Sequence, residues 1–293
     1  MIIETPDDVT RAVLGEMHRT PNARTQELLA LLVKHLHAFV REARLSEREF
    51  QEAIAAINAI GKRTTPSHNE AMLLAGALGL SNLVCLINNG ARGTQPTQAN
   101  NLGPFYRANA PRCADGESIV RSPTPGPALF FRGSVTDMDG RPLAGADVHV
   151  WQSSPAGLYE NQDATQAEMN LRGIFTTQAD GTFSFRSVKP AGYPLPTDGP
   201  TGALLAAQKR HNMRPAHLHF LLYKPGYKTI ASQVYDPEDP HLETDSQFGV
   251  TRALIGNYAR TPDGYRLDFT FRLERGEALL PKAPISEKVG AAA

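Results

Sequence analysis

The chain from about residue 100 onward is marked by short runs in which apolar and polar residues alternate, the pattern of a half-buried β-strand. The clearest runs are Phe130 to Thr136, Asp147 to Gln152, Thr182 to Ser187 and Leu218 to Tyr223. Turn signals rich in Gly and Asp lie between them, as in Asp137 to Gly140 and Ala179 to Gly181. Regular short strands with such turns are typical of packed antiparallel sheets. The sequence therefore predicts a mainly antiparallel β-sandwich over residues 101–293.

The first hundred residues have helical spacing instead, with apolar residues recurring every three or four positions. These residues are Leu28, Leu29, Leu31, Leu32 and Leu36, followed by Phe50, Ile54, Ile57 and Ile60. We expect four or five helices, the last running from Glu70 to about Asn88 with Ser67 or Asn69 as its cap. The predicted fold class is therefore α+β, with a helical domain over residues 1–100 followed by the β-sandwich domain.

Two segments carry neither pattern. Residues 89–99 are rich in Asn, Gly, Thr and Gln, which indicates a linker between the two predicted domains. The Ala-rich end after Glu287 is expected to be a frayed tail.

The composition narrows the classes of partner and compartment. Lys and Arg number 30, and Asp and Glu number 30, so no general attraction to nucleic acid or to an anionic membrane is expected. Cys85 and Cys113 are the only cysteines, and we expect both to be small buried residues rather than redox groups. The start of the chain has no leader pattern, and Gly and polar residues break the apolar run from Ala71 to Asn88. We expect a reduced, cytoplasmic protein whose partners are small molecules or other proteins.

Candidate chemistry first appears in the segment Arg214-Pro-Ala-His-Leu-His219-Phe-Leu-Leu-Tyr, which alternates as a strand does. A strand sends every second side chain to the same face, so His217 and His219 point together and form half of a metal site. His35 and His37 have the same spacing in a helical run, where such residues diverge by about 200° and do not share a ligand. A His pair on a strand is about as often simply packed or solvated, so the remaining ligands decide the interpretation.

Two tyrosines in loops upstream of this strand are candidates for the remaining ligands. Tyr159 ends the segment Trp151-Gln-Ser-Ser-Pro-Ala-Gly-Leu-Tyr159, and Tyr193 lies in Pro190-Ala-Gly-Tyr193-Pro-Leu-Pro. The chain has no CxxC and no HExxH motif, which are common zinc-binding patterns. Two phenolates with two neutral imidazoles would favour Fe³⁺ over Zn²⁺ or Cu⁺. Either tyrosine taken alone is more simply explained as a half-buried residue of the sandwich.

A series of motifs over roughly residues 70–275 resembles the intradiol ring-cleaving dioxygenases. The motifs are, in order, Leu102-Gly-Pro-Phe-Tyr106, Gly133-x-Val-x-Asp-x-Asp-Gly-x-Pro-Leu-Ala-Gly-Ala146, Val150-Trp-Gln with Gly157-Leu-Tyr159, Met169-Asn-Leu-Arg-Gly173, Gly192-Tyr-Pro-x-Pro-x-Asp-Gly-Pro-x-Gly202 and Arg214-Pro-Ala-His-Leu-His219. The resemblance implies that one non-haem Fe³⁺ per subunit is held by Tyr159, Tyr193, His217 and His219.

The same resemblance implies the residues that meet the substrate. Arg214 and Gln233 would face it as catalytic residues, together with the labile ligand Tyr193. The substrate pocket would be lined by Leu73, Gly76, Gly103, Pro104, Phe105, Gly249 and Val250.

The implied activity is cleavage of an aromatic diol by O₂ between its two hydroxyl-bearing carbons. The diol would bind Fe³⁺ through both oxygens, Tyr193 would take up one of its protons, and the charged Arg214 would stabilise negative charge on the ring. The segments Pro215-Ala-His-Leu-His219 and Asp245-x-x-Phe-Gly-Val250 look most like those of hydroxyquinol 1,2-dioxygenases. Their product is 3-hydroxy-cis,cis-muconate, which tautomerises to maleylacetate. Catechol or a substituted catechol, giving cis,cis-muconates, is the runner-up substrate.

One position departs from the family pattern, because many relatives carry Ser-Asp where this chain has Ala75-Gly76. We expect Gly76 to leave open space where a carboxylate would accept a third ring hydroxyl, so that the surrounding residues select by shape. Hydroxyquinol is then expected to be the best simple substrate, with catechol measurably turned over.

The helical start resembles the family's N-terminal dimerisation domain, which implies a homodimer with a phospholipid bound at its interface. His35 or His37 would lie near this lipid, although a solvated helix face is the simpler explanation for both.

Two other functions remain open from the sequence. The motif from Gly133 to Ala146 also resembles non-catalytic transthyretin-like binding modules, although these lack the two tyrosines and two histidines in this order. Extradiol cleavage at Fe²⁺, held by two His and one carboxylate, is disfavoured because Fe²⁺ gains little from phenolates.

Overall fold

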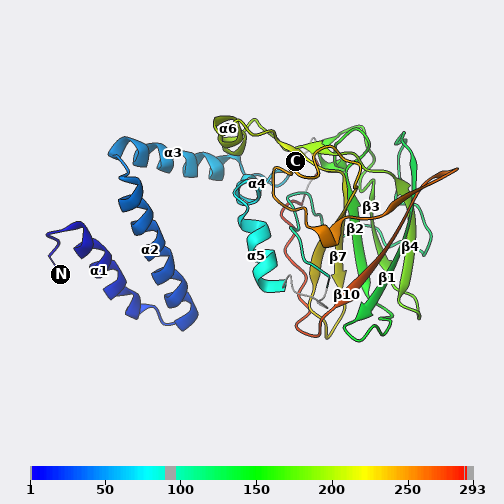
Figure 1. Cartoon of the computed structure of the whole chain (residues 1–293), viewed down its shortest axis with the longest axis horizontal. Helices are drawn as coiled ribbons and strands as arrows, with labels where there is room; N and C mark the ends of the chain where they lie inside the picture. The colour runs from blue at the N-terminus through cyan, green and yellow to red at the C-terminus, as the bar shows by residue number, and fades with distance from the viewer. Residues whose placement is uncertain (1, 90–96, 287, 289–293) are drawn as a thin grey trace. The chain divides into compact units, whose positions relative to one another are not determined.

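The structure is a computed structural model that describes residues 2–89, 97–286 and 288 of the chain. Most of the predicted linker at residues 89–99, and most of the predicted tail after Glu287, lie outside the described residues. The chain divides into two compact units, Met1–Asn58 and Ala59–Ala293 (Figure 1). The domain division predicted at residue 100 follows composition rather than packing, and it stays a prediction.

The first unit is helical and consists of α1 (Pro6–Glu16), the 3₁₀ helix η1 (Met17–Arg19), α2 (Ala23–Ala43) and most of α3 (Glu47–Arg63). Among the side chains of α2 and α3, all of which the structure describes, none is buried in the single chain. Their exposed apolar side chains are Leu28, Leu29, Leu31, Leu32, Leu36, Phe39, Val40, Phe50, Ile54 and Ile57. These helices therefore present an extended apolar surface to the surroundings.

The prediction of one helix from Glu70 to Asn88 is wrong, because two helices, α4 (Glu70–Ala77) and α5 (Leu80–Asn89), replace it. Asn69 caps α4 as expected, since its side chain accepts a hydrogen bond from the Met72 N–H at 3.0 Å. The break comes at Gly79, whose φ of 72° is left-handed and favours glycine. Among the described helices, none is long and apolar enough by itself to cross a membrane. Helices α4 and α5, which are bent by 73° relative to each other, would together have the length and composition of a membrane span.

The second unit contains two four-stranded sheets. The first has the order β4 (Thr182–Val188), β1 (Ala128–Asp137), β10 (Gly264–Leu273), β9 (Tyr258–Thr261). The second has the order β3 (Arg172–Thr176), β2 (Asp147–Gln152), β7 (His217–Tyr223), β8 (Ile230–Tyr235). β1 and β10 pair in parallel, and the other neighbouring strands in both sheets are antiparallel. The predicted α+β class with a mainly antiparallel β-sandwich is confirmed.

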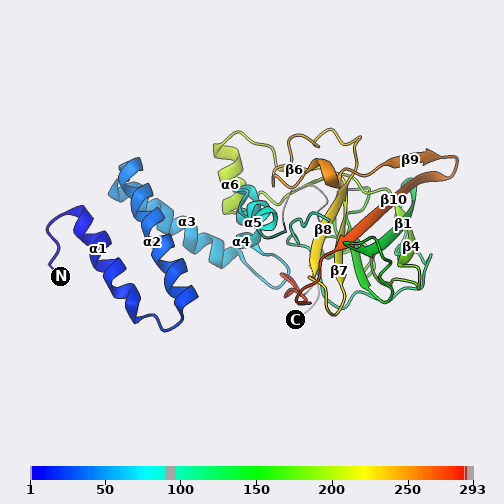
Figure 2. The same ribbon diagram turned by 60° about the horizontal axis from the view of Figure 1, so that its bottom comes forward.

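Shorter elements of the second unit lie outside the two sheets. A small two-stranded sheet joins β5 (Tyr193–Pro194) to β6 (Met213–Arg214), with α6 (Pro200–Ala207) between them in the chain. The 3₁₀ helices η2 and η3 cover Glu160–Gln162 and Arg252–Leu254. In both views α4, α5 and α6 lie together on one side of the sandwich (Figure 2).

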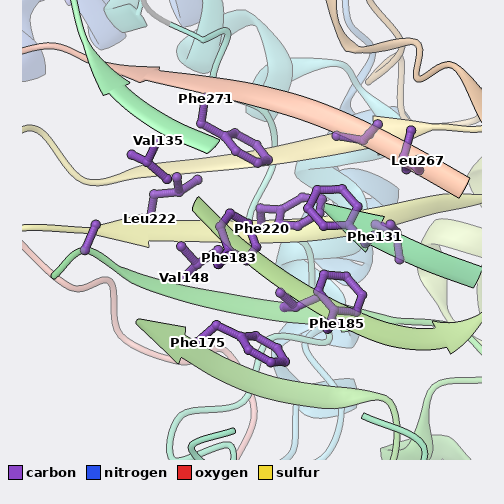
Figure 3. Close-up of a cluster of buried hydrophobic side chains, with 14 of the residues drawn as sticks. Phe131, Val135, Val148, Phe175, Phe183, Phe185, Phe220, Leu222, Leu267 and Phe271 are labelled. Atoms are coloured by element: carbon purple, nitrogen blue, oxygen red, sulfur yellow. The ribbon is translucent and has the colours of Figure 1, made fainter. Parts of the chain in front are cut away.

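The core between the two sheets is rich in phenylalanine (Figure 3). Phe131 of β1 stacks on Phe185 of β4 with ring centroids 4.8 Å apart, and its centroid lies 4.9 Å from that of Phe220 of β7. Phe220 in turn lies 4.9 Å from Phe271 of β10. Aromatic contacts thus tie strands of one sheet to β7 of the other.

Strand β7 is buried on both of its faces. Leu218, Phe220 and Leu222 belong to the core between the sheets. Leu221 points the other way, into a second apolar cluster that includes Tyr159 and Tyr193. Because side chains alternate along a strand, His217 and His219 lie on the same face as Leu221. The packing of the sandwich therefore determines which way the two histidines point.

Truncation of Phe131 tests the importance of this core. Phe131→Ala removes a buried ring from between the sheets and is expected to lower the free energy of unfolding by about 3 to 5 kcal/mol. Its neighbour Phe130 is 40% exposed, so Phe130→Ala is the matched control and should cost about 1 kcal/mol or less. Chemical denaturation of both variants measures the difference, and equal losses would contradict the assigned core.

Candidate metal and substrate site

The two histidines of β7 are buried neighbours whose Nε2 atoms lie 3.0 Å apart. Nδ1 of His217 lies 2.6 Å from the Pro215 carbonyl oxygen, which only accepts, so Nδ1 carries the proton and Nε2 carries a lone pair. Burial, with the nearby Arg214 charge, lowers the pKa of His217 to about 3. Burial and the His217 ring likewise lower the pKa of His219 well below its ordinary value. Both imidazoles are neutral, the form that binds metals.

The two predicted tyrosines lie against this pair. The rings of Tyr159 and Tyr193 meet edge to face with centroids 5.0 Å apart. The ring centroid of Tyr159 is 6.1 Å from that of His219, and that of Tyr193 is 5.5 Å from that of His217. All four side chains are buried. The structure thus brings the four predicted metal ligands together.

The Tyr159 hydroxyl is the feature that indicates a bound ion. It is buried without a hydrogen-bond partner in the described part of the chain, and burial raises the pKa of Tyr159 well above its ordinary value. In native proteins, a buried polar group without a hydrogen-bond partner commonly contacts a bound ion or a water molecule. A highly charged cation would offset the cost of ionising the phenol. Two phenol oxygens and two imidazole nitrogens fit a hard trivalent ion such as Fe³⁺.

Other side chains offer no competing metal site among the residues described. No group of three or more His, Cys, Asp or Glu side chains is placed there to hold a metal ion. A metal ion held by His217 and His219 would therefore need the tyrosine oxygens to complete its coordination.

Arg214 is fully buried beside the four candidate ligands. Its Nε and Nη2 donate to the two carboxylate oxygens of Asp245, each at 3.0 Å. Nη2 also donates to Gln233 Oε1 and Tyr235 Oη at 3.0 Å, and Nη1 donates to Tyr193 Oη at 3.4 Å. The guanidinium is thus fixed in a bidentate ion pair, with Nη1 directed at Tyr193 and at Nε2 of His217, 3.3 Å away.

Asp245 is the counterion that allows this charge to be buried. It also accepts hydrogen bonds from the backbone N–H groups of Gln247 and Gly249, at 3.1 and 2.8 Å. Burial opposes ionisation of this carboxyl, but Arg214 and the two N–H groups hold its pKa below the ordinary value. One carboxylate therefore orients both Arg214 and the loop that contains Gly249.

Gln233 lies opposite His219 in the β7–β8 pairing, as Trp151 does in the β2–β7 pairing. Its Nε2 donates to the Asn101 carbonyl at 2.8 Å, while its Oε1 accepts from Arg214. Both ends of the amide are thus engaged within the protein. Gln233 holds Arg214 in place beside the candidate ligands.

Most of the predicted pocket residues lie at this site. Leu73 and Phe105 share an apolar cluster with Tyr159 and Tyr193, and Phe105 stacks on Tyr159 with centroids 4.5 Å apart. Gly103, at φ 76°, approaches so closely that a Cβ would lie 3.1 Å from His219 Cε1, and Pro104 beside it is also buried.

The two predicted pocket residues after Asp245, Gly249 and Val250, have different surroundings. Gly249 lies against Arg214, because a Cβ there would be 2.7 Å from Nη2. Val250 is half-buried and lines a cleft together with Leu242 and Phe248.

The expectation of open space at Gly76 is wrong. A Cβ on Gly76 would lie 2.5 Å from Cδ and 2.8 Å from Nε2 of Gln247. The Gln247 carboxamide therefore already fills the position that a side chain at Gly76 would take. The sequence did not reveal this contact, because the two residues are far apart in the chain.

Arg172 is a further buried charge that the sequence analysis missed. Its Nε donates to Glu160 Oε1 at 2.7 Å, and its Nη1 donates to the Phe105 carbonyl at 2.7 Å. Glu160 follows the candidate ligand Tyr159 directly in the chain. Arg172 therefore connects the Tyr159 segment to the Phe105 segment of the predicted pocket. Its position within the motif Met169-Asn-Leu-Arg-Gly173 could have indicated a role for Arg172 at the site.

Known proteins resemble this chain over nearly its whole length. Residues 102–275 match the family described as Dioxygenase, and residues 22–95 match the Catechol dioxygenase N terminus. The 6-chlorohydroxyquinol 1,2-dioxygenase of Cupriavidus pinatubonensis is 40% identical over 91% of this chain and 96% of its own. The catechol 1,2-dioxygenase of Candida albicans is 38% identical over 86% and 88%.

A solved structure gives the same result at the level of the fold. The hydroxyquinol 1,2-dioxygenase of Pseudomonas putida DLL-E4 superposes with a TM-score of 0.83 at 33% identity, covering 92% of this chain and 99% of its own. A non-catalytic binding module and an extradiol enzyme, the two functions left open by the sequence, do not account for these matches. The chain belongs to the intradiol ring-cleavage dioxygenase family, as its sequence motifs predicted.

Proposed function

We propose that the protein cleaves hydroxyquinol, benzene-1,2,4-triol, between its two adjacent hydroxyl-bearing carbons, giving 3-hydroxy-cis,cis-muconate and hence maleylacetate. The observation that carries this proposal is the convergence of Tyr159, Tyr193, His217 and His219 beside the buried Arg214. Relatives whose names give hydroxyquinol or its chlorinated form as substrate, at 35 to 40% identity, support the choice of ring.

The cofactor proposed for the four ligands is one Fe³⁺ per subunit. When bound, the ferric ion supplies Lewis acidity that favours loss of the diol protons and makes the ring reactive toward O₂. The neutral imidazoles of His217 and His219 contribute lone pairs without adding charge, while Tyr159 and Tyr193 contribute anionic oxygens. This division suits a trivalent ion, whose excess positive charge the two phenolates reduce.

Tyr193 is proposed to accept a proton from the substrate at its Oη. Its hydroxyl already receives a hydrogen bond from Arg214 Nη1, so a hydroxyl that rotates away from the ligand position stays within the polar network. Tyr159 has no such partner in the described part of the chain. We therefore assign the labile role to Tyr193 and the permanent role to Tyr159.

Arg214 is proposed to stabilise negative charge that develops on the substrate. A guanidinium remains charged at any relevant pH, and Asp245 with Gln233 fixes its orientation before the substrate arrives. Donors fixed in this way at a dry site are typically worth about 3 to 4 kcal/mol of transition-state stabilisation. The stacked rings of Phe105 and Tyr159 belong to the apolar cluster that borders the site.

Catechol is the second candidate substrate. The similarity to a protein named catechol 1,2-dioxygenase supports it, at 38% identity over 86% of this chain. Both rings present the same pair of adjacent hydroxyls and differ only in the third.

We propose in addition that the first unit forms a homodimer and holds a phospholipid. The exposed apolar side chains of α2 and α3 need a second surface to cover them. A cleft of about 290 Å³ in this unit is lined by Pro6, Val9, His37, Val40 and Arg41, which suits an acyl chain near a positive charge. His37 is thus the candidate at the lipid, as the sequence suggested, and its Nδ1 lies 2.9 Å from Thr10 Oγ1.

A substrate panel tests the proposed activity. Oxygen uptake and product identification with hydroxyquinol, catechol, chlorocatechols and protocatechuate should give hydroxyquinol the highest kcat/KM. Catechol should follow within about 10- to 200-fold, because one small ring substituent discriminates modestly. A protein that cleaves none of these diols, or that prefers catechol, would contradict the assignment.

Replacement of either histidine tests the metal site. His217→Ala and His219→Ala should each weaken iron binding by more than the roughly 10- to 100-fold that loss of a supporting residue costs. Elemental analysis of the purified variants measures bound iron, and circular dichroism checks that the sandwich remains folded. His211 is exposed and lies outside β7, so His211→Ala is the control and should keep its iron. Full iron content in either β7 variant would defeat the assignment.

Analytical ultracentrifugation tests the dimer. The wild-type chain should sediment as a dimer at micromolar concentration, and Leu32→Asp should shift it toward the monomer, because a charge is placed in the apolar surface of α2. Leu32→Met keeps that surface apolar and should remain dimeric. A monomeric wild type would refute the proposal.

A further inference from the structure

Gln247 occupies a place at the site that no role described so far explains. Its side chain is buried, and its carboxamide lies against Gly76 of α4, where it excludes any Cβ. Its backbone N–H donates to Asp245 Oδ1 at 3.1 Å. The residue is thus held from one side by the Asp245 carboxylate and packed on the other side against a helix.

The amide nitrogen of this side chain, Nε2, is buried and has no hydrogen-bond partner within the described part of the chain. A buried N–H group without an acceptor is costly, and native proteins rarely keep one unless a ligand or water completes it. An acceptor atom from outside the protein is therefore expected next to Nε2.

The surroundings of Gln247 place its carboxamide close to the candidate site. Gly76 lies one helical turn after Leu73, so the two share a face of α4. Leu73 packs in the apolar cluster that contains Tyr159 and Tyr193. On the opposite side, the Asp245 carboxylate that binds the Gln247 backbone also binds Arg214. Gln247 thus lies between Arg214 and the face of α4 that borders the candidate metal ligands.

We propose that Gln247 determines specificity by donating a hydrogen bond from Nε2 to the oxygen of the third ring hydroxyl. This inference rests on the proposed cleavage of a diol at this site. It assigns to Gln247 the recognition of the third ring substituent. A neutral amide N–H, unlike a carboxylate, accommodates any acceptor or electronegative substituent. The subsite therefore takes a hydroxyl or a chlorine at this ring position, and it disfavours a methyl group of similar size.

Binding to the iron-loaded wild-type enzyme without O₂ gives the first test. The dissociation constants of hydroxyquinol and 4-methylcatechol are compared by optical titration, because these rings differ in one group of similar size. Hydroxyquinol should bind roughly 5- to 150-fold more tightly, since the methyl group leaves the buried N–H unpaired. Equal affinities would overturn the proposal without any variant being made.

Two variants provide independent tests of the same contact. Gln247→Met keeps the length of the side chain and removes the amide, so the preference for hydroxyquinol over 4-methylcatechol should fall to within about 2-fold. Gly76→Ala leaves Gln247 intact but displaces its carboxamide, and it should lower the same ratio. Gly61→Ala is the matched control, because it adds a methyl to another helix where nothing lies within 4 Å, and it should leave the ratio unchanged.

The outcomes separate this inference from the proposed function. Ring cleavage by the wild type with a ratio unaltered in both folded variants would overturn the role of Gln247 alone. Failure of the wild type to cleave any of the diols would overturn the proposed function and this inference together. Should Gln247→Met fail to fold, the wild-type ratio and Gly76→Ala still decide the matter.

Discussion

Strand β7 is the element on which both the fold and the site depend. Leu218, Phe220 and Leu222 anchor one of its faces in the core between the sheets, and His217 and His219 are carried on the other. A shift of one residue in the β2–β7 or β7–β8 register would move the histidines into the core and bring the apolar residues to the site. The large apolar area buried by Phe220 and its neighbours opposes such a shift. The stability of the sandwich therefore fixes the direction of the two histidine side chains.

A second constraint is the placement of one positive charge beside two imidazoles. Arg214 is fully buried, and its charge is tolerated because Asp245 neutralises it. Gln233 and Tyr235 accept hydrogen bonds from its Nη2, and Tyr193 accepts one from its Nη1. The same charge works with burial to lower the pKa of His217 to about 3. The two imidazoles are consequently neutral across the neutral pH range, which is the form that a metal ion would need. In the proposed function the same guanidinium would also stabilise negative charge on the substrate.

Local patterns in the sequence were sufficient for several of the strands and for the shared face of His217 and His219, whereas Tyr159 and Tyr193 were proposed from the family resemblance. The run Asp147 to Gln152 coincides with β2, and the alternation of β7 correctly placed His217 and His219 on one face. The helix predicted across Gly79 failed because a left-handed glycine leaves no trace in apolar spacing. The sequence patterns also could not predict the pairing of Asp245 with Arg214 or the packing of Gln247 on Gly76. Both join residues distant in the chain, and no local periodicity carries that information.

The central claim is that Tyr159, Tyr193, His217 and His219 together hold a ferric ion, and visible spectroscopy of the iron-loaded wild type tests it most directly. Tyrosinate bound to Fe³⁺ gives a charge-transfer absorption in the visible region, which histidine and carboxylate ligands do not produce. With one iron bound per chain, the protein is predicted to be coloured, and Tyr159→Phe should lose most of that absorption while Tyr258→Phe, in the buried core away from the candidate ligands, keeps it. A colourless protein that binds stoichiometric Fe³⁺ would contradict the claim.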